Sequence, residues 1–262
     1  MEQIEIGDLR IAFRRAGQGP PLVLLHGGIS DSREWSRQLA GLSDAFTVVA
    51  WDAPGCGGSS DPPESFNMAE YADCLASFID ALGLGRPHVL GLSFGATLAL
   101  ELYRRNSTLP RTLVLASAYA GWAGSLPANV IAERLEAFRQ ELELPPEELA
   151  RRWIPSLFTD QASAAMIDES VVIMSEFHPH GARTMIHAMA ETDLRDVLPR
   201  IDVPTLLLYG EIDERSPLAV AEELHARIPR SLLVVLPGVG HQANVEAAEV
   251  FNESIRTFLR SQ

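Results

Sequence analysis

Lysine is absent from the chain, so all 21 of its basic residues are arginines, and 35 aspartates and glutamates outnumber them. The formal net charge is therefore −14 over 262 residues. A surplus of carboxylates repels the phosphates of nucleic acids and the head groups of anionic lipids. We expect no nucleic-acid partner and no membrane partner, and we attach no function to the missing lysines.

Cysteines and long apolar runs are also scarce. Cys56 and Cys74 are the only cysteines, too few for a disulfide framework or a cysteine-based metal cluster. Residues Met1–Ile6 lack the basic start and apolar run of a signal peptide. No window approaches the ~20 consecutive apolar residues of a membrane-spanning helix. We expect a cytoplasmic monomer or homodimer without a metal site.

Apolar residues are plentiful enough for a large core, at 47% of the chain against 21% charged residues. A chain of this length can form a single α/β domain. Six short apolar runs alternate with helical patterns: Leu22–Leu25, Phe46–Trp51, His88–Leu92, Thr112–Ala116, Thr205–Tyr209 and Leu232–Leu236. Continuous apolar runs of this length are typical of parallel strands buried on both faces.

Two further strands, Gln3–Ile6 and Leu9–Arg15, are expected to form a hairpin at the start of the chain. Helical patterns between the later strands cover Met68–Leu82, Ala96–Arg105, Leu218–Ile228 and Ala247–Leu259. The sequence therefore predicts the α/β fold class, with a mostly parallel, eight-stranded sheet flanked by helices.

The alternation stops between Tyr119 and about Asp193, where prolines break helical patterns and no buried-strand run occurs. The helical stretches there are Ile131–Leu142, Glu147–Trp153 and Ala182–Ala190. We expect a core domain of residues 1–118 and 194–262, with a helical lid inserted at residues 119–193. Candidates for the underside of this lid are the aromatic residues Trp122, Trp153, Phe158 and Phe177.

The strongest chemical signal is the segment Gly91–Gly95, which matches the pattern G-x-S-x-G. A predicted strand leads into Ser93, and a helix rich in small residues leads out of it. Such a sharp turn exposes the serine hydroxyl at the carboxyl end of the sheet, where open α/β sheets bind ligands. We expect Ser93 to be a nucleophile.

A serine nucleophile needs a base, usually histidine. Of the seven histidines, His88 lies at the wrong end of its strand, about 13 Å from Ser93. His241 follows the last predicted strand through a loop at the carboxyl edge of the sheet, so we expect His241 to be the base. His26 also ends a strand at that edge, but the glycine pair after it indicates another role.

The base in turn needs a carboxylate that holds its tautomer. Asp213 follows the strand Thr205–Tyr209 at the same edge and is the expected acid. Glu211 and Glu214 lie close in the sequence and stay open as alternatives. The order Ser, Asp, His along the chain is the order found in α/β-hydrolases.

The tetrahedral intermediate of acyl transfer needs fixed N–H donors for its oxyanion. We expect them on Phe94, which follows the nucleophile, and on Gly28, in the loop after the first parallel strand. The candidate pocket residues are Ile29, Trp122, Trp153, Phe158, Arg183 and Gln242.

Taken together, these motifs resemble the α/β-hydrolase superfamily. His26-Gly27-Gly28 is similar to its oxyanion loop, and Asp52–Ser59 is similar to its D-x-x-G-x-G-x-S segment. Ser at position 93 excludes the dehalogenases and epoxide hydrolases of this fold, which use aspartate. Thr192–Arg195 is similar to the 3-oxoadipate enol-lactonase group. The resemblance implies an enzyme that needs no cofactor.

The expected function is cleavage of a small ester or lactone through an acyl-enzyme. Two alternatives stay open: a carbon–carbon bond hydrolase or perhydrolase with the same triad, and a slow-turnover ligand receptor of this fold. Gln242 disfavours the carbon–carbon bond hydrolases, which carry tryptophan after the histidine. A carboxylate-bearing lactone would need a cation in the pocket, and the candidates are the lid residues Arg134, Arg139 and Arg183.

Overall fold

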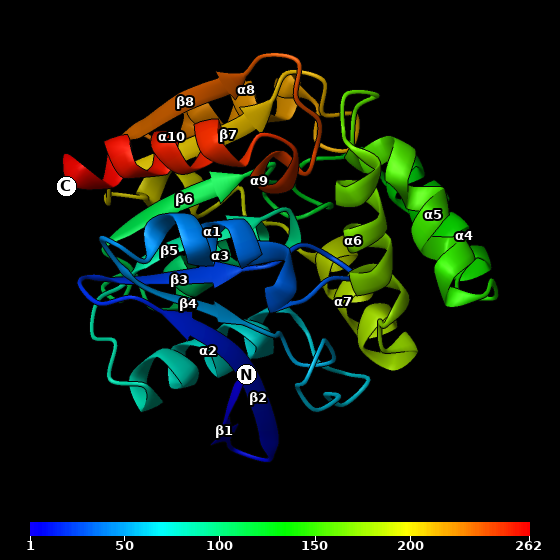
Figure 1. Cartoon of the computed structure of the whole chain (residues 1–262), viewed down its shortest axis with the longest axis horizontal. Helices are drawn as coiled ribbons and strands as arrows, with labels where there is room; N and C mark the ends of the chain where they lie inside the picture. Colours follow the sequence, from blue (N-terminus) through cyan, green and yellow to red (C-terminus); the bar gives the residue numbers. More distant parts are fainter.

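The computed structural model describes all residues, 1–262, and contains eight strands. They are β1 (Glu2–Ile6), β2 (Leu9–Ala16), β3 (Pro21–Leu25), β4 (Thr47–Trp51), β5 (His88–Leu92), β6 (Thr112–Ala116), β7 (Thr205–Gly210) and β8 (Ser231–Leu236). They form one sheet in the order β1-β2-β4-β3-β5-β6-β7-β8 (Figure 1). Strands β3 to β8 run parallel, and β2 joins β4 antiparallel. The predicted fold class is confirmed.

Both faces of the sheet are covered, which explains the continuous apolar runs of the strands. Leu22 and Leu24 of β3 point into one core cluster, whereas Val23 and Leu25 point into the other. Helices α1 (Ser36–Leu42) and α10 (Ala248–Arg260) cover the first face (Figure 1). Helices α2 (Met68–Ala81), α3 (Phe94–Arg105) and α8 (Leu218–Arg227) cover the second.

Three helices were not predicted from the sequence: α1, α6 (Ala164–Ser175) and α9 (Ala243–Glu246). Helices α1 and α9 span seven and four residues, too short to show a helical period. Helix α6 contains the β-branched run Val171-Val172-Ile173, a composition that favours strands. Burial of Val171 and Ile173 against neighbouring elements overrides that local preference.

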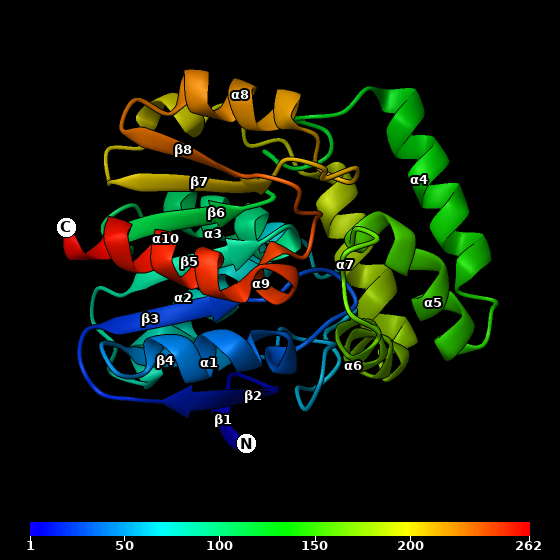
Figure 2. The same cartoon turned by 45° about the horizontal axis from the view of Figure 1, so that its top comes forward.

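Four helices occupy the interrupted part of the pattern: α4 (Ala128–Glu141), α5 (Pro146–Leu157), α6 and α7 (Pro179–Glu191). We call them the inserted helices; they lie together beyond the carboxyl ends of the parallel strands (Figure 2). The chain enters and leaves this segment at adjacent points, because Leu194 N–H donates to Ala120 O at 2.9 Å and Trp122 N–H donates to Met189 O at 3.0 Å. None of the helices combines the length and the apolar composition that crossing a membrane would require.

Candidate active site

Ser93 occupies a strained turn between the end of β5 and the start of α3. Its backbone angles, φ 52° and ψ −107°, lie outside the regions that non-glycine residues favour. The turn leaves no room for side chains on either flank. A Cβ on Gly91 would lie 2.2 Å from the carbonyl carbon of Gly95, and one on Gly95 would lie 2.1 Å from Leu25 O. The two glycines are therefore steric requirements of the turn.

His241 and Asp213 are in direct contact. The His241 Nδ1 lies 2.9 Å from both carboxylate oxygens of Asp213, and both side chains are nearly fully buried. The backbone N–H groups of Arg215 and Ser216 donate to Asp213 Oδ1 at 2.9 and 2.8 Å. Burial on its own would raise the pKa of the Asp213 carboxyl, but His241 and these donors outweigh it and hold that pKa below its usual value.

Neither alternative acid, Glu211 or Glu214, forms a hydrogen bond with His241. The Glu211 carboxylate accepts the Gly238 N–H at 2.8 Å, and Glu214 is exposed to solvent. His26 is also engaged, with its Nε2 accepting the Ala53 N–H at 3.0 Å. Asp213 is thus the carboxylate that this structure brings to His241.

The loop that carries His241 is held from several sides. The Ser117 hydroxyl donates to the His241 carbonyl at 3.2 Å. On either side of His241, Gly240 N–H donates to Glu246 at 3.0 Å, and Gln242 N–H donates to the Leu157 carbonyl at 3.0 Å. Because Leu157 ends helix α5, the inserted helices take part in positioning this loop.

The two predicted oxyanion donors line the same cavity as Ser93. Phe94 is the first residue of α3, so its N–H has no partner within the helix. In the other loop, Gly27 N–H already donates to Glu34 Oε1 at 3.2 Å, whereas a Cβ on Gly28 would meet no atom within 4 Å. Gly28 therefore adjoins open space, as close approach of a substrate oxygen would need.

Glu34 is a buried carboxyl that sequence reasoning missed. It is 3% exposed, and besides Gly27 it accepts a hydrogen bond from Gln242 Nε2 at 3.4 Å. Burial raises the pKa of this carboxyl, against the lowering effects of His26 and the hydrogen-bond donors around it. Glu34 thus supports both the oxyanion loop and the residue that follows His241.

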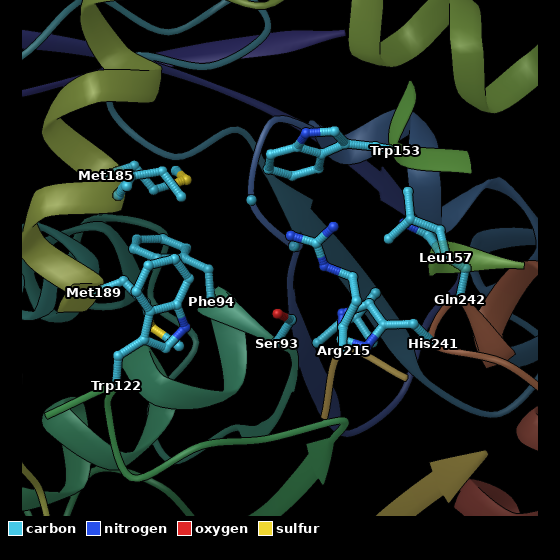
Figure 3. Close-up of a pocket in the computed structure, with 14 residues that line it drawn as sticks. Ser93, Phe94, Trp122, Trp153, Leu157, Met185, Met189, Arg215, His241 and Gln242 are labelled. Carbon is cyan, nitrogen blue, oxygen red and sulfur yellow. The ribbon is translucent and has the colours of Figure 1, made fainter. Parts of the chain in front are cut away.

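Ser93 and His241 line one cavity beneath the inserted helices, which encloses about 490 Å³ including the solvent at its mouth. Its walls are mainly apolar. The apolar lining residues are Leu92, Phe94, Trp122, Trp153, Leu157, Met185, Ile186 and Met189. Figure 3 shows Ser93 between a group formed by Phe94, Trp122 and the two methionines and a second group that includes Arg215 and His241.

Of the predicted pocket residues, Trp122, Trp153 and Gln242 line this cavity. The others do not. Ile29 has φ 54° and is buried in the core cluster on the α2–α3 face of the sheet. Phe158 is buried in the same core cluster, and Arg183 lies on the exposed side of α7.

Sequence reasoning missed several lining residues of this cavity, and Arg215 is the arginine among them. Its guanidinium carbon lies 4.2 Å from the centre of the Trp153 ring, and its Nη1 donates to Ser156 Oγ at 2.9 Å. The only sequence signal for it is its place two residues after Asp213. That spacing alone does not tell which way the side chain points.

The fold and this site define a class of protein. The chain matches the profile of the alpha/beta hydrolase family over residues 22–254 and belongs to that family. The predicted resemblance to this superfamily is confirmed.

Individual relatives are similar over nearly their full length. An esterase from Thermogutta terrifontis, solved with malate bound, has 28% identity, a TM-score of 0.92, and coverage of 100% of this chain and 99% of its own. The pimeloyl-[acyl-carrier protein] methyl ester esterase of Vibrio campbellii is 25% identical, with 92% and 95% covered. The enol-lactonase of Burkholderia xenovorans LB400 shares the fold, at 24% identity and a TM-score of 0.90, with 99% and 100% covered.

Proposed function

We propose that this protein is a serine hydrolase that cleaves a small ester or lactone, with Ser93 as nucleophile, His241 as base and Asp213 as the acid that orients it. The observation that carries the proposal is the contact of His241 Nδ1 with both Asp213 oxygens at 2.9 Å, in a cavity that Ser93 also lines. With Nδ1 facing the carboxylate, Nε2 is the nitrogen free to act on the serine proton.

In the proposed reaction, His241 Nε2 takes the proton of the Ser93 hydroxyl as Oγ attacks the substrate carbonyl carbon. The oxyanion that forms accepts hydrogen bonds from the N–H groups of Gly28 and Phe94. The bond to the leaving oxygen then breaks, and His241 gives its proton to that oxygen. Water attacks the acyl–Ser93 ester by the same steps, which releases the acid and restores the enzyme.

In this proposal the inserted helices serve as a lid. Trp153 of α5 and Met185 of α7 form part of the cavity wall, together with Trp122 in the segment before α4. A cover of this kind excludes water from the site and strengthens the electrostatic interactions inside it. Apolar side chains with a few polar groups among them are the usual lining of a small-molecule site.

The family and the named relatives support an ester-bond hydrolase. The Thermogutta protein is an esterase, and the Vibrio protein is a methyl ester esterase. Only the name of the Vibrio protein states a substrate, so these relatives support the reaction type more strongly than any one compound.

A hydrolysis screen tests the proposal. The purified protein is given p-nitrophenyl esters of increasing acyl length, a set of γ- and δ-lactones, and a vinylogous diketone of the ring-cleavage type. We expect turnover of short esters or lactones that disappears in Ser93→Ala. Turnover of the diketone alone would indicate a carbon–carbon bond hydrolase. A single slow turnover on every ester would indicate a ligand receptor and overturn the proposal.

A further inference from the structure

Arg215 is a cation in the wall of the cavity that holds Ser93 and His241 (Figure 3). It follows β7 in the loop that carries Asp213, and its own backbone N–H donates to Asp213 Oδ1. The same short loop therefore places both a carboxylate behind His241 and a guanidinium at the cavity surface.

The Arg215 guanidinium has no counter-ion in the protein. No carboxylate oxygen lies within 4.0 Å of it, and its one hydrogen bond goes to the hydroxyl of Ser156. A guanidinium carries five N–H donors in a planar fork, so four of them have no protein acceptor. Burial, and then the nearby charge of Arg134, lower the pKa of this group, yet an arginine side chain stays charged in proteins.

Arg215 is held by two inserted helices, with α5 contacting its guanidinium and α4 its backbone. Its face stacks on Trp153 of α5, with 4.2 Å between the guanidinium carbon and the ring centre. Arg134 of α4 donates to the Arg215 carbonyl at 3.2 Å. The side chain is therefore held in place, and because it is half-buried, its free N–H groups stay accessible to an acceptor that enters the cavity.

The arginines expected from the sequence to supply a pocket cation do not line this cavity. Arg139 is paired with Glu136 at 2.8 Å in solvent, and Arg183 is exposed. Arg134 lies over the ring of Trp122 at 5.4 Å and lines a neighbouring cavity, which Arg215 also borders. Arg215 is the only charged lining residue near Ser93 besides the base His241.

We infer that Arg215 is an anion-binding subsite, and that the substrate is a short ester or lactone that carries a free carboxylate. This inference rests on the proposed function and names its substrate class. Planar carboxylates match the arginine fork and can accept two parallel hydrogen bonds from it. The apolar residues on the far side of Ser93, Phe94, Trp122 and Met189, suit the hydrocarbon part of such a substrate (Figure 3).

The test compares the monomethyl esters of succinate, glutarate and adipate with the corresponding dimethyl esters. Each pair differs only in the free carboxylate, and three chain lengths allow for its distance from Ser93. The variants are Arg215→Met, which keeps the apolar stem, Arg215→Lys, which keeps the charge, and the control Arg139→Met on the exposed lid surface.

We expect the wild type to have a higher kcat/KM for at least one half-ester than for its diester. Arg215→Met should lose about ten- to a hundredfold in kcat/KM on that half-ester, the usual size of a charge-assisted hydrogen bond. Its loss on the diester should be clearly smaller than its loss on the half-ester. Arg215→Lys should retain part of the preference, and Arg139→Met should match the wild type on both. Equal losses on half-ester and diester would mean that Arg215 only joins the loop to α5, and would overturn the inference.

Calorimetric binding of glutarate separates this inference from the proposed function. We expect the wild type to bind the dianion and Arg215→Met to bind it at least tenfold more weakly. Glutarate binding without turnover of any ester would support the anion site but contradict the proposed reaction. Turnover of diesters with no half-ester preference and no glutarate binding would contradict the anion site alone.

Discussion

At the scale of single residues, the site depends on the backbone conformation of Ser93. Its positive φ is a strained conformation for a side chain with a Cβ, and such strain persists only where the surroundings impose it. Here a buried strand ends at Leu92 and a buried helix begins at Phe94, so Ser93 is the single residue that connects the two elements. The hydroxyl is thereby presented to the cavity instead of to the core.

Substitutions in the triad should show that its members act as a unit. Ser93→Ala and His241→Ala should each lower kcat by about 10⁴-fold or more, and the double variant should be little worse. Asp213→Asn should also be severe, because an amide does not hold the same tautomer of His241. Steady-state kinetics on the best ester would measure this. Near-normal activity of Asp213→Asn beside a collapse of Glu211→Gln would refute the assignment of the acid.

Glu34 predicts a pH dependence of stability. Because the pKa of this carboxyl is raised in the folded protein, the folded state binds the proton more tightly than the unfolded chain. The free energy of unfolding should therefore fall as pH rises from the usual carboxyl range through the raised pKa. Glu34→Gln lacks this titration, so its stability relative to the wild type should improve between pH 5 and pH 8.

Urea unfolding at both pH values measures this difference. Glu222→Gln, on the exposed side of α8, is the matched control. Its free energy of unfolding should differ from that of the wild type by the same amount at both pH values. If the stability of Glu34→Gln relative to the wild type is the same at both pH values, or is lower at pH 8, Glu34 does not titrate as described.

At the scale of elements, the contact between β3 and α3 decides whether the turn at Ser93 can form. A methyl group on Gly95 would overlap the carbonyl of Leu25, so strand and helix would have to separate. Overpacking of this kind costs about 1–3 kcal/mol or more. Gly95→Ala should lower the melting temperature by several degrees and abolish most activity.

Gly83→Ala is the control for this prediction. Gly83 also has positive φ, at 65°, but a Cβ there would meet no atom within 4 Å. We expect roughly 1–2 kcal/mol of backbone cost and unchanged kcat. Full activity of Gly95→Ala at normal stability would show that the strand–helix contact is not a constraint.

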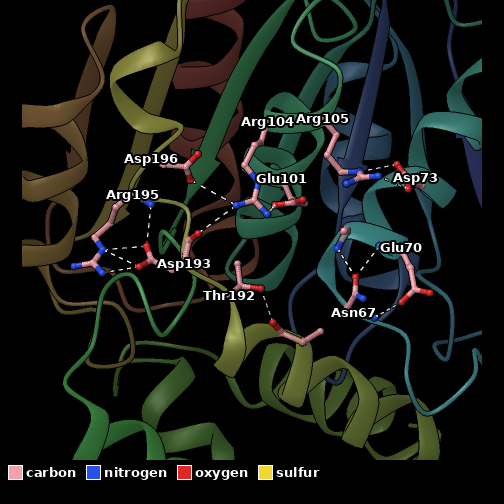
Figure 4. Close-up of polar contacts among 12 residues, drawn as sticks. Asn67, Glu70, Asp73, Glu101, Arg104, Arg105, Thr192, Asp193, Arg195 and Asp196 are labelled. Atoms are coloured by element: carbon pink, nitrogen blue, oxygen red, sulfur yellow. Dashed lines mark hydrogen bonds and ion pairs between the residues drawn. The ribbon is translucent and has the colours of Figure 1, made fainter.

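A second link joins α3 to the chain leaving the inserted helices (Figure 4). Arg104 lies 2.6 Å from the Glu101 carboxylate, which is fully buried, and 3.5 Å from that of Asp196. Its Nη1 also donates to the carbonyl of Asp193 at 3.4 Å. The Glu101 oxygens have no well-aligned hydrogen bond, so the charge of Arg104 is their main compensation.

Arg104→Met should therefore destabilise the protein strongly, because it leaves a buried carboxylate without its cation. The loss should stay below the roughly 3–5 kcal/mol of a fully buried pair, since Arg104 is about one third exposed. Adding Glu101→Gln should recover most of it. Chemical unfolding of the two single variants and the double variant measures the coupling energy between Arg104 and Glu101. If the changes in unfolding free energy of the single variants simply add up in the double variant, the coupling is absent.

Much of this architecture could be predicted because it depends on local patterns. The strands at His88–Leu92 and Thr112–Ala116 begin and end as predicted, since buried parallel strands have an unmistakable run of apolar residues. Helix α6 could not be predicted, because its β-branched run becomes helical only through packing. The direction of Arg215 depends on where Trp153 lies, and that contact joins residues 62 positions apart.

At the scale of the whole molecule, the site is assembled from both parts of the chain. The core supplies Ser93, Asp213 and His241, while the inserted helices supply much of the cavity wall. The two parts meet beside the loop that carries His241, where Thr159 N–H donates to Glu246 of α9 at 3.1 Å. Movement of the inserted helices would therefore act directly on the residues around His241.

Covalent labelling by a fluorophosphonate tests the central claim most directly, because this reagent reacts with an activated serine and needs no knowledge of the substrate. Intact mass spectrometry of the folded protein should show one adduct, and peptide mapping should place it on Ser93. Labelling should be absent in Ser93→Ala and much slower in His241→Ala. An adduct on another residue, or undiminished labelling of Ser93→Ala, would contradict the assignment of Ser93 as the nucleophile.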